Sequence, residues 1–233
     1  LENLVSVSLP ASLKTIGYDA FAESGLSSIE IPDNVTTMEE RAFRHCTSLA
    51  SVEIGKNLKE IPAYAFARCG ELTDIRIPET VAGIGYSAFG DCTSLTSVEI
   101  PDGVASIGAW AFSGCSQLAS VRIGKALTAM EEYAFEDCTA LTSVQWDAVD
   151  FQGQCRFPST LTDVAFGPEV ERVPYGICSS CAQLAHVEFP ASVKSIGDYA
   201  FSGCTGLQDI PLPEGLQSIG RFAFENCTGI TSV

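Results

Sequence analysis

The sequence predicts a right-handed α/β repeat solenoid of about ten coils, each of 23 residues with one short parallel strand and one helical turn. The first observation is a leucine that recurs along nearly all of the 233 residues, at spacings of 22, 23, 23, 23, 23, 23, 20, 23 and 23. The second is that each unit contains two kinds of apolar spacing, and the third is a cysteine that returns at one position of most units. The leucines that open the units are Leu4, Leu26, Leu49, Leu72, Leu95, Leu118, Leu141, Leu161, Leu184 and Leu207, and Ile230 opens an eleventh.

A typical unit is residues 95–117, LTSVEIPDGVASIGAWAFSGCSQ, and its positions define 23 slots that the other units share. Apolar residues at slots 4 and 6, here Val98 and Ile100, alternate with polar residues as in a strand with one buried face. Proline or glycine follows at slot 7 and ends the strand. A second apolar pair at slots 10 and 13, here Val104 and Ile107, turns the chain.

The second half of the unit is predicted to be a glycine turn followed by a helical turn. Glycine at slot 14, such as Gly108, suits a backbone that needs positive φ. Ala111 and Phe112, at slots 17 and 18, are predicted to lie in one short helical turn. A single unit cannot bury its own apolar edge, so the units must stack. We therefore expect residues 1–233 to form a single domain, excised from a longer array.

The L-x-x-V-x-I-P and I-G-x-x-A-F-x-x-C blocks resemble those of the BspA-like, or Treponema pallidum-type, leucine-rich repeat family of bacterial and some protist surface proteins. The resemblance extends over nearly all 233 residues. It implies a leucine-rich repeat solenoid and, for some members of the family, cell-surface adhesion or binding of host proteins.

Composition and motifs argue against several classes of function. Thirteen Lys and Arg against 29 Asp and Glu give a net charge of −16, which opposes binding to nucleic acids or anionic lipids. No apolar run approaches the roughly 20 residues of a membrane-spanning helix. The two histidines, His45 and His186, occupy unrelated slots of distant units, and no nucleophile, phosphate-binding or metal-binding motif is present. We therefore expect no enzymatic activity, no cofactor and no metal site.

Eight of the ten cysteines share slot 21 and form a ladder along the array. They are Cys46, Cys69, Cys92, Cys115, Cys138, Cys181, Cys204 and Cys227. Parallel side chains in identical surroundings do not give the dihedral angle of a disulfide, whereas free cysteine behaves as a small buried hydrophobe. We interpret the ladder as reduced and structural. Reduced thiols are typical of cytosolic proteins, but the family resemblance points to surface proteins of anaerobic bacteria, and we expect an extracellular or cell-surface location.

Cys178 and Cys181 form a C-x-x-C motif, the spacing of dithiol redox sites and of one half of many zinc sites. Cys181 belongs to the ladder, and Cys178 stands at slot 18, where other units place phenylalanine. The motif therefore arises because cysteine replaces phenylalanine, and redox chemistry is a weak hypothesis. Either Ile177 or a neighbouring aromatic residue fills the space, or the two thiols lie close enough to oxidise.

The unit at residues 141–160, LTSVQWDAVDFQGQCRFPST, breaks the repeat; we call it the short coil. It lacks the Ala-Phe pair, Trp146 takes slot 6, and Cys155 lies off the ladder. Because a coil without the helical turn is thinner, we predict a kink or notch around residues 147–158. Such irregular units often carry function in repeat proteins. The alternative is a decayed repeat that is filled by its own aromatic residues.

Two surfaces are candidates for binding. The outward residues Glu53, Arg76, Glu99 and Arg122 at slot 5 alternate in charge, and adjacent strands bring such residues close together. We interpret them as a ladder that neutralises itself, because a ligand-binding stripe would have one sign.

The second surface is formed by slots 15 and 16, where all six tyrosines fall. They predict an aromatic ridge along one edge of the rod, and exposed aromatic residues are the usual anchors of protein interfaces. The alternative is that each ring covers the neighbouring coil and shields the core. The candidate protein-binding residues are Tyr64, Tyr86, Trp110, Tyr133, Tyr175, Tyr199 and Phe222.

Together these observations favour a non-enzymatic module that binds a protein ligand, in adhesion or recognition of a host protein by a bacterial surface protein. The alternative is a structural spacer that displays another domain from the cell surface. We expect a monomer with no nucleic-acid partner and no insertion into the membrane.

Overall fold

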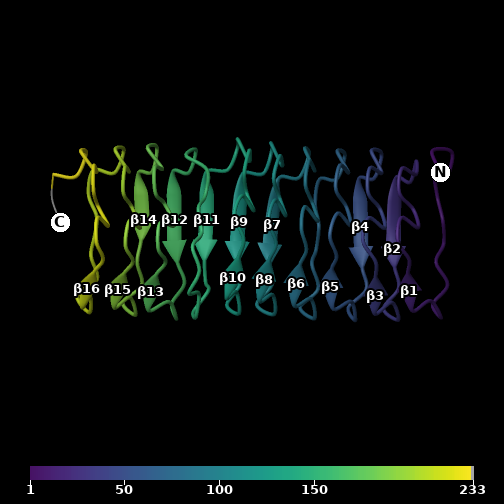
Figure 1. The fold of residues 1–233 in the computed structure, drawn as a ribbon, viewed down its shortest axis with the longest axis horizontal. Coiled ribbons are helices and arrows are strands. Elements are labelled where there is room, and N and C mark those ends of the chain that lie inside the picture. The colour runs from purple at the N-terminus through teal and green to yellow at the C-terminus, as the bar shows by residue number, and fades with distance from the viewer. Residues whose placement is uncertain (232–233) are drawn as a thin grey trace.

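The computed structural model describes residues 1–231 and shows a rod of stacked coils along which the chain advances from one end to the other (Figure 1). Each pair of neighbouring strands in the described residues is parallel. The fold is a parallel β-solenoid of about nine coils, as leucine-rich repeats form. Successive units therefore stack in sequence order along the rod.

In seven units, the short coil among them, a strand lies within slots 3 to 6, as predicted. These strands are β2 (Ser28–Ile31), β4 (Ser51–Ile54), β7 (Ser97–Ile100), β9 (Ser120–Ile123), β11 (Ser143–Trp146), β12 (Asp163–Phe166) and β14 (His186–Glu188). Slots 4 and 6 point into the core and slots 3 and 5 point outward, so that β7 has strictly alternating burial. Strands pair slot for slot, with Ser97 opposite Ser120.

A second row of two-residue strands at slots 12 and 13 was not predicted. These strands are β1 (Thr15–Ile16), β3 (Thr37–Met38), β5 (Glu60–Ile61), β6 (Gly83–Ile84), β8 (Ser106–Ile107), β10 (Ala129–Met130), β13 (Arg172–Val173), β15 (Ser195–Ile196) and β16 (Ser218–Ile219). They form the lower row in Figure 1. Two residues are too few for alternation to reveal a strand, so the sequence indicated only a turn here.

The α/β class and the helical turn of each coil were wrong. Residues 1–231 contain no helix, and hence none that is long and apolar enough to span a membrane. Slots 16 and 20 adopt positive φ, for example 57° at Tyr64 and 63° at Arg68, which interrupts helical geometry. This backbone turns the amides of slots 16, 18 and 20 toward carbonyls of the following coil, and Tyr64, Phe66 and Arg68 donate across at 2.9, 2.8 and 2.7 Å. We call this third set of bonds the turn ladder.

The glycines at slot 14 have a different purpose from the one predicted. Gly85 and Gly108 do not have positive φ. A Cβ at Gly85 would lie 2.6 Å from the amide nitrogen of Ala63, and one at Gly108 would lie 2.8 Å from that of Tyr86. Such contacts are too short for any side chain, so close stacking of the coils requires glycine.

The core consists of rows of identical side chains that run along the rod. The rings of Phe66, Phe89 and Phe112 at slot 18 stack with centroids 5.5 and 5.1 Å apart. Beside them runs the cysteine ladder, and all ten cysteines are free thiols. The Sγ atoms of Cys92 and Cys138 donate to slot-18 carbonyls of the preceding coil at 3.2 and 3.1 Å. The ladder therefore fills space and also supplies a donor to a backbone carbonyl in every coil.

The first unit keeps this arrangement without a cysteine. Ser24 occupies slot 21, is buried, and places its Oγ 3.2 Å from the Sγ of Cys46. A hydroxyl thus takes the position of the missing thiol.

Candidate functional site

The candidate residues at slots 15 and 16 form two rows of touching rings, which we call the ridge. In the first row Tyr64, Tyr86, Trp110 and Tyr133 follow one another at centroid distances of 5.1, 5.3 and 5.3 Å. The second row consists of Tyr175, Tyr199 and Phe222, at distances of 5.7 and 5.2 Å. Tyr86, Tyr133, Tyr175 and Phe222 are 41 to 50 % exposed. The rings lie on one another along the surface, which leaves their outer edges open to a partner.

An arginine extends the first row toward the start of the chain. Arg41 occupies slot 16 of a coil that has no aromatic residue there, and its guanidinium carbon lies 5.4 Å from the Tyr18 ring centroid and 5.5 Å from that of Tyr64. The Arg41 Nη1 also donates to the Tyr18 hydroxyl. A cation thus bridges rings that stand two coils apart.

Ridge residues at slot 16 have an unfavourable backbone. Tyr64, Trp110, Tyr133, Tyr199 and Phe222 have φ between 55° and 64°, a region that bulky residues rarely occupy. Positive φ recurs at slot 16 of every coil except the short coil, and asparagine, aspartate or glycine would adopt it at lower cost. The aromatic side chains are therefore not explained by local backbone preference.

The two rows of the ridge end on either side of a hollow at the short coil. Its volume is about 630 Å³, and Tyr133 lines it on one side, Tyr175 and Tyr199 on the other. Residues 154–159 form part of its lining, which includes the buried rings of Phe135 and Phe157. The predicted notch is confirmed, and the thinner coil is its cause.

The turn ladder is also interrupted at the hollow. In the other coils that precede another coil the amides of slots 18 and 20 reach that next coil, but within the described chain those of Phe135 and Asp137 make no bond to the short coil. Phe157 keeps the core continuous, because its ring lies 5.4 Å from that of Phe135. The backbone gap therefore lies at the surface, above a closed core.

Carboxylates surround this gap. Glu131, Glu132, Glu136 and Asp137 line the near side and Arg156 is the cation among the lining residues. Glu136 accepts a hydrogen bond of 3.1 Å from the Trp110 indole, so it is held at the end of the first row of the ridge. The site combines aromatic faces, unpaired amide donors and negative charge.

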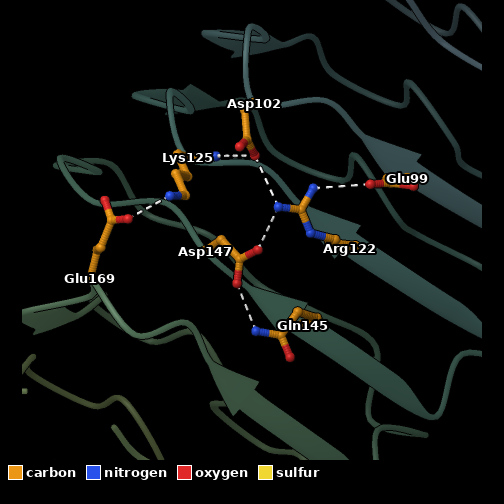
Figure 2. Close-up of polar contacts among 7 residues, drawn as sticks. All are labelled: Glu99, Asp102, Arg122, Lys125, Gln145, Asp147 and Glu169. Atoms are coloured by element: carbon orange, nitrogen blue, oxygen red, sulfur yellow. Dashed lines mark hydrogen bonds and ion pairs between the residues drawn. The ribbon is translucent and has the colours of Figure 1, made fainter. Parts of the chain in front are cut away.

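The opposite side of the short coil carries a closed polar network (Figure 2). Arg122 reaches Glu99 at 3.1 Å, Asp102 at 2.9 Å and the largely buried Asp147 at 2.8 Å. Asp147 also accepts a bond of 2.6 Å from Gln145. Of the predicted charge series only the pair of Glu99 and Arg122 forms among the described residues, and sequence reasoning missed Asp147. The available signal was its place at slot 7, where other units have proline or glycine.

The network's protonation follows from its geometry. Burial works to raise the pKa of Asp102, but the hydrogen bonds from the Arg122 side chain and the Lys125 backbone outweigh it and lower that pKa. Burial disfavours the charge on Arg122, yet Asp102, Asp147 and Glu99 together raise its pKa. A hydrogen bond to Glu169 raises the pKa of Lys125. Each of Asp102, Arg122 and Lys125 thus has a partner of opposite charge within the network.

Cys178 and Cys181 are both buried and both free thiols. Burial raises the pKa of Cys178 well above its usual range, and a hydrogen bond from that thiol lowers the pKa of Cys181. The row of stacked phenylalanines is interrupted at Cys178, and the neighbouring Ile177 is fully buried beside it. In the next coil the ring of Phe189 meets that of Phe201 edge-on at 5.9 Å. No group of three or more potential metal ligands occurs in residues 1–231.

Comparison with known proteins agrees with this architecture. The family model described as BspA type leucine rich repeat region matches in six copies, over residues 1–95, 59–181 and 171–233. A leucine-rich repeat protein from Bacteroides ovatus is 30% identical over 97% of this chain and 65% of its own, with a TM-score of 0.69. One from Eubacterium ventriosum is 25% identical over 94% and 63%, with a TM-score of 0.57.

The leucine-rich repeat protein of T. pallidum is 26% identical over 78% of both chains, with a TM-score of 0.55. The chain spans less than two thirds of the length of the first two proteins. No curated protein sequence matches it. The family model covers the whole chain, and the chain belongs to the BspA-type leucine-rich repeat family.

Proposed function

We propose that the chain is a non-enzymatic recognition module of a bacterial surface protein, and that it binds a protein ligand through the ridge and the hollow. Leucine-rich repeats of this family generally bind proteins, and the family occurs on cell surfaces. The observation that carries the proposal is the ridge itself, two rows of touching aromatic rings of which four, Tyr86, Tyr133, Tyr175 and Phe222, are exposed.

The energetic argument concerns slot 16. A left-handed backbone costs a non-glycine residue roughly 1–2 kcal/mol, and in the neighbouring coils Asp19, Ser87 and Gly176 fill the same slot. Folding alone therefore does not require an aromatic side chain there. Tyrosine and tryptophan are the residues that most often anchor protein interfaces, so interface binding accounts for their recurrence.

A structural spacer is the second candidate. Figure 1 favours it in one respect, because the chain enters and leaves at opposite ends of the rod and would separate whatever domains are joined to it. A spacer needs neither the ridge nor the hollow, which separates the two candidates experimentally.

Alanine variants of ridge residues test the proposal. Trp110→Ala, Tyr133→Ala and Tyr199→Ala are compared with the parent protein for binding to a panel of purified host matrix proteins by surface plasmon resonance. We expect at least about tenfold weaker binding for one variant or more, the size expected for an interface anchor. Surface-exposed Glu30→Ala, on the strand side, is the control. Unchanged binding in all three variants would remove the ridge from the interface, and absence of binding to every protein would favour the spacer.

The cell-surface location is tested on intact bacteria that express the full-length protein. Antibody against this chain should label unpermeabilised cells, and brief protease treatment should remove the label. Labelling that appears only after permeabilisation would contradict the location.

A further inference from the structure

The hollow interrupts the ridge and the turn ladder at the same coil, and this coincidence defines what it can accommodate. The inference that follows rests on the proposed function, since it names the kind of segment that binds there. The volume of about 630 Å³ lies within the range of about 300–1,000 Å³ that is typical of ligand sites. The groups on the walls of the hollow indicate what a bound segment has to supply.

Both walls present backbone groups that are paired in other coils. The amides of Phe135 and Asp137 make no bond to the short coil, and on the far wall the carbonyls of Ile177 and Ser179 receive none from it, within residues 1–231. The short coil pairs with the far wall at one point, where Gln154 and Tyr175 form an isolated bridge. Elsewhere the equivalent groups pair at distances such as 2.8 Å from Phe66 to the next coil. An extended segment offers alternating carbonyls and amides, as in peptides that add a strand to an open sheet edge.

The rings at the rim select the side chain. One coil lies between the coils of Tyr133 and Tyr175, as one lies between those of Tyr18 and Tyr64. Between Tyr18 and Tyr64, Arg41 of the intervening coil occupies the space between the two rings. Arg156 of the short coil also lines the hollow, but among the described residues its guanidinium lies over neither ring. The place that Arg41 fills in one coil is therefore unfilled in the other.

Charge points to the same side chain. Four carboxylates and one arginine line the hollow, on a chain whose net charge is −16. This charge attracts a cation and repels an acidic segment. A guanidinium also stacks on aromatic faces better than an ammonium group does.

We propose that the hollow binds an extended segment of a partner protein that carries an arginine. The backbone of the segment pairs with the open amides and carbonyls of the turn ladder, and its guanidinium lies between Tyr133 and Tyr175 beside Glu132. The bound segment joins the two rows of the ridge into one surface.

The probe is the acetylated and amidated peptide Thr-Val-Arg-Val-Thr with a fluorescent label, followed by fluorescence anisotropy against the whole chain. Citrulline in place of arginine keeps the shape and removes the charge, and we expect binding to weaken about tenfold. N-methylation of both valines removes two amide donors, and we expect binding to be lost. Equal binding of all three peptides would overturn the proposal, as would no binding of the parent peptide at about 1 mM.

Two variants of the protein locate the site. Gly176→Trp places an indole in the hollow, because Gly176 already has φ of 60°, its nearest side-chain neighbour would lie 4.0 Å from a new Cβ, and Trp110 occupies the same slot at φ of 55°. We expect this variant to bind the peptide at least tenfold more weakly. Replacement of residues 141–160 by a copy of residues 95–117 restores a full coil and should abolish peptide binding.

The control variant is Glu30→Ala, an exposed residue of β2 outside the ridge and the hollow, which should leave peptide binding unchanged. Circular dichroism establishes that each variant is folded, and Gly176→Trp remains decisive if the coil replacement does not fold. Undiminished binding to Gly176→Trp would overturn the proposal. If the peptide fails to bind while a matrix protein still loses affinity in Trp110→Ala, the arginine segment is wrong and the ridge remains the interface.

Discussion

The short coil is fully paired with its neighbours on its strand side and largely unpaired on its turn side. On the strand side Trp146 stays in the core, Asp147 reaches Arg122, and the sheet continues through β11 to β12 with every slot paired. On the turn side the turn ladder stops, a single bridge joins Gln154 to Tyr175, the ridge is interrupted, and a hollow remains. The loss of three residues is therefore compensated where the sheet needs continuity and left uncompensated at the hollow. We therefore expect substitutions on the strand side to lower stability more than substitutions on the turn side.

The largest loss of stability is expected from the strand side. Arg122→Met leaves the largely buried Asp147 without its cation and sets it near Glu99 and Asp102. Removal of one partner of a buried ion pair costs about 3–5 kcal/mol, and since the Arg122 side chain is 32% exposed, we expect about 2–3 kcal/mol in urea unfolding.

Arg68→Met is the matched control, because the pair of Arg68 and Asp91 is 60% exposed on both partners, and its loss should cost less than about 0.5 kcal/mol. The double variant Arg122→Met, Asp147→Asn should recover part of the stability. Equal effects of the two single variants would show that the network does not support the short coil.

The next effect concerns the core just after the short coil. Cys178→Phe restores the consensus residue at slot 18, but Cys178 and Ile177 are already fully buried and the core is packed around a side chain smaller than phenylalanine. We expect the variant to lose about 2 kcal/mol through overpacking, measured by urea unfolding, whereas Cys178→Val should lose less. A more stable Cys178→Phe protein would mean that the row of phenylalanines has room for another ring.

A pH effect should arise from the regular coils. Burial raises the pKa of Cys92 and Cys138 from 9.0 to about 12. Above pH 9 the unfolded chain releases these protons while the native chain retains them, so the contribution of these two thiols to stability is constant below pH 9 and falls as pH rises from 9 toward 12. Each thiol contributes about 1.4 kcal/mol per pH unit in that window. Urea midpoints at pH 8 and 10 measure the loss, and Cys92→Ala should reduce it.

The smallest effect is expected on the turn side. Tyr133→Gly relieves a left-handed backbone of φ 64° and loses the contact between its ring and Trp110. The two contributions are of similar size, so we expect the unfolding free energy to change by no more than about 0.5 kcal/mol. Ala134→Gly, at a neighbouring residue without positive φ, should cost about 1 kcal/mol. A loss above about 2 kcal/mol in Tyr133→Gly would give the ridge a structural purpose.

Much of the core could be predicted from the sequence, because the period fixes which slots face inward. Val98, Ile100, Phe112 and Cys115 are all buried, and the notch followed from a missing segment of the unit. The helical turn could not be recognised as wrong, since positive φ at slot 16 occurs with residues as different as Asp19, Arg41 and Tyr64 and so leaves no mark in the residue types of the unit.

The polar network around Arg122 could not be predicted from the sequence for the same reason. Arg122 was recognised as one member of an alternating series, but its main buried partner, Asp147, belongs to the one unit that breaks the pattern. Because the pattern is derived from the regular units, it gives no information on which residues of the short coil interact. The ridge residues, in contrast, repeat in the pattern and were found.

The turn ladder also gives one edge of the rod an electric polarity. Its amides point toward the C-terminal end in coil after coil, whereas the amides of Gly85 and Gly108 on the neighbouring side donate to the preceding coil. Aligned peptide dipoles add along such a row, much as they do along a helix. At the hollow the positive end of one row faces the negative end of the next across open space, so a peptide group that enters meets a field already aligned with its own dipole.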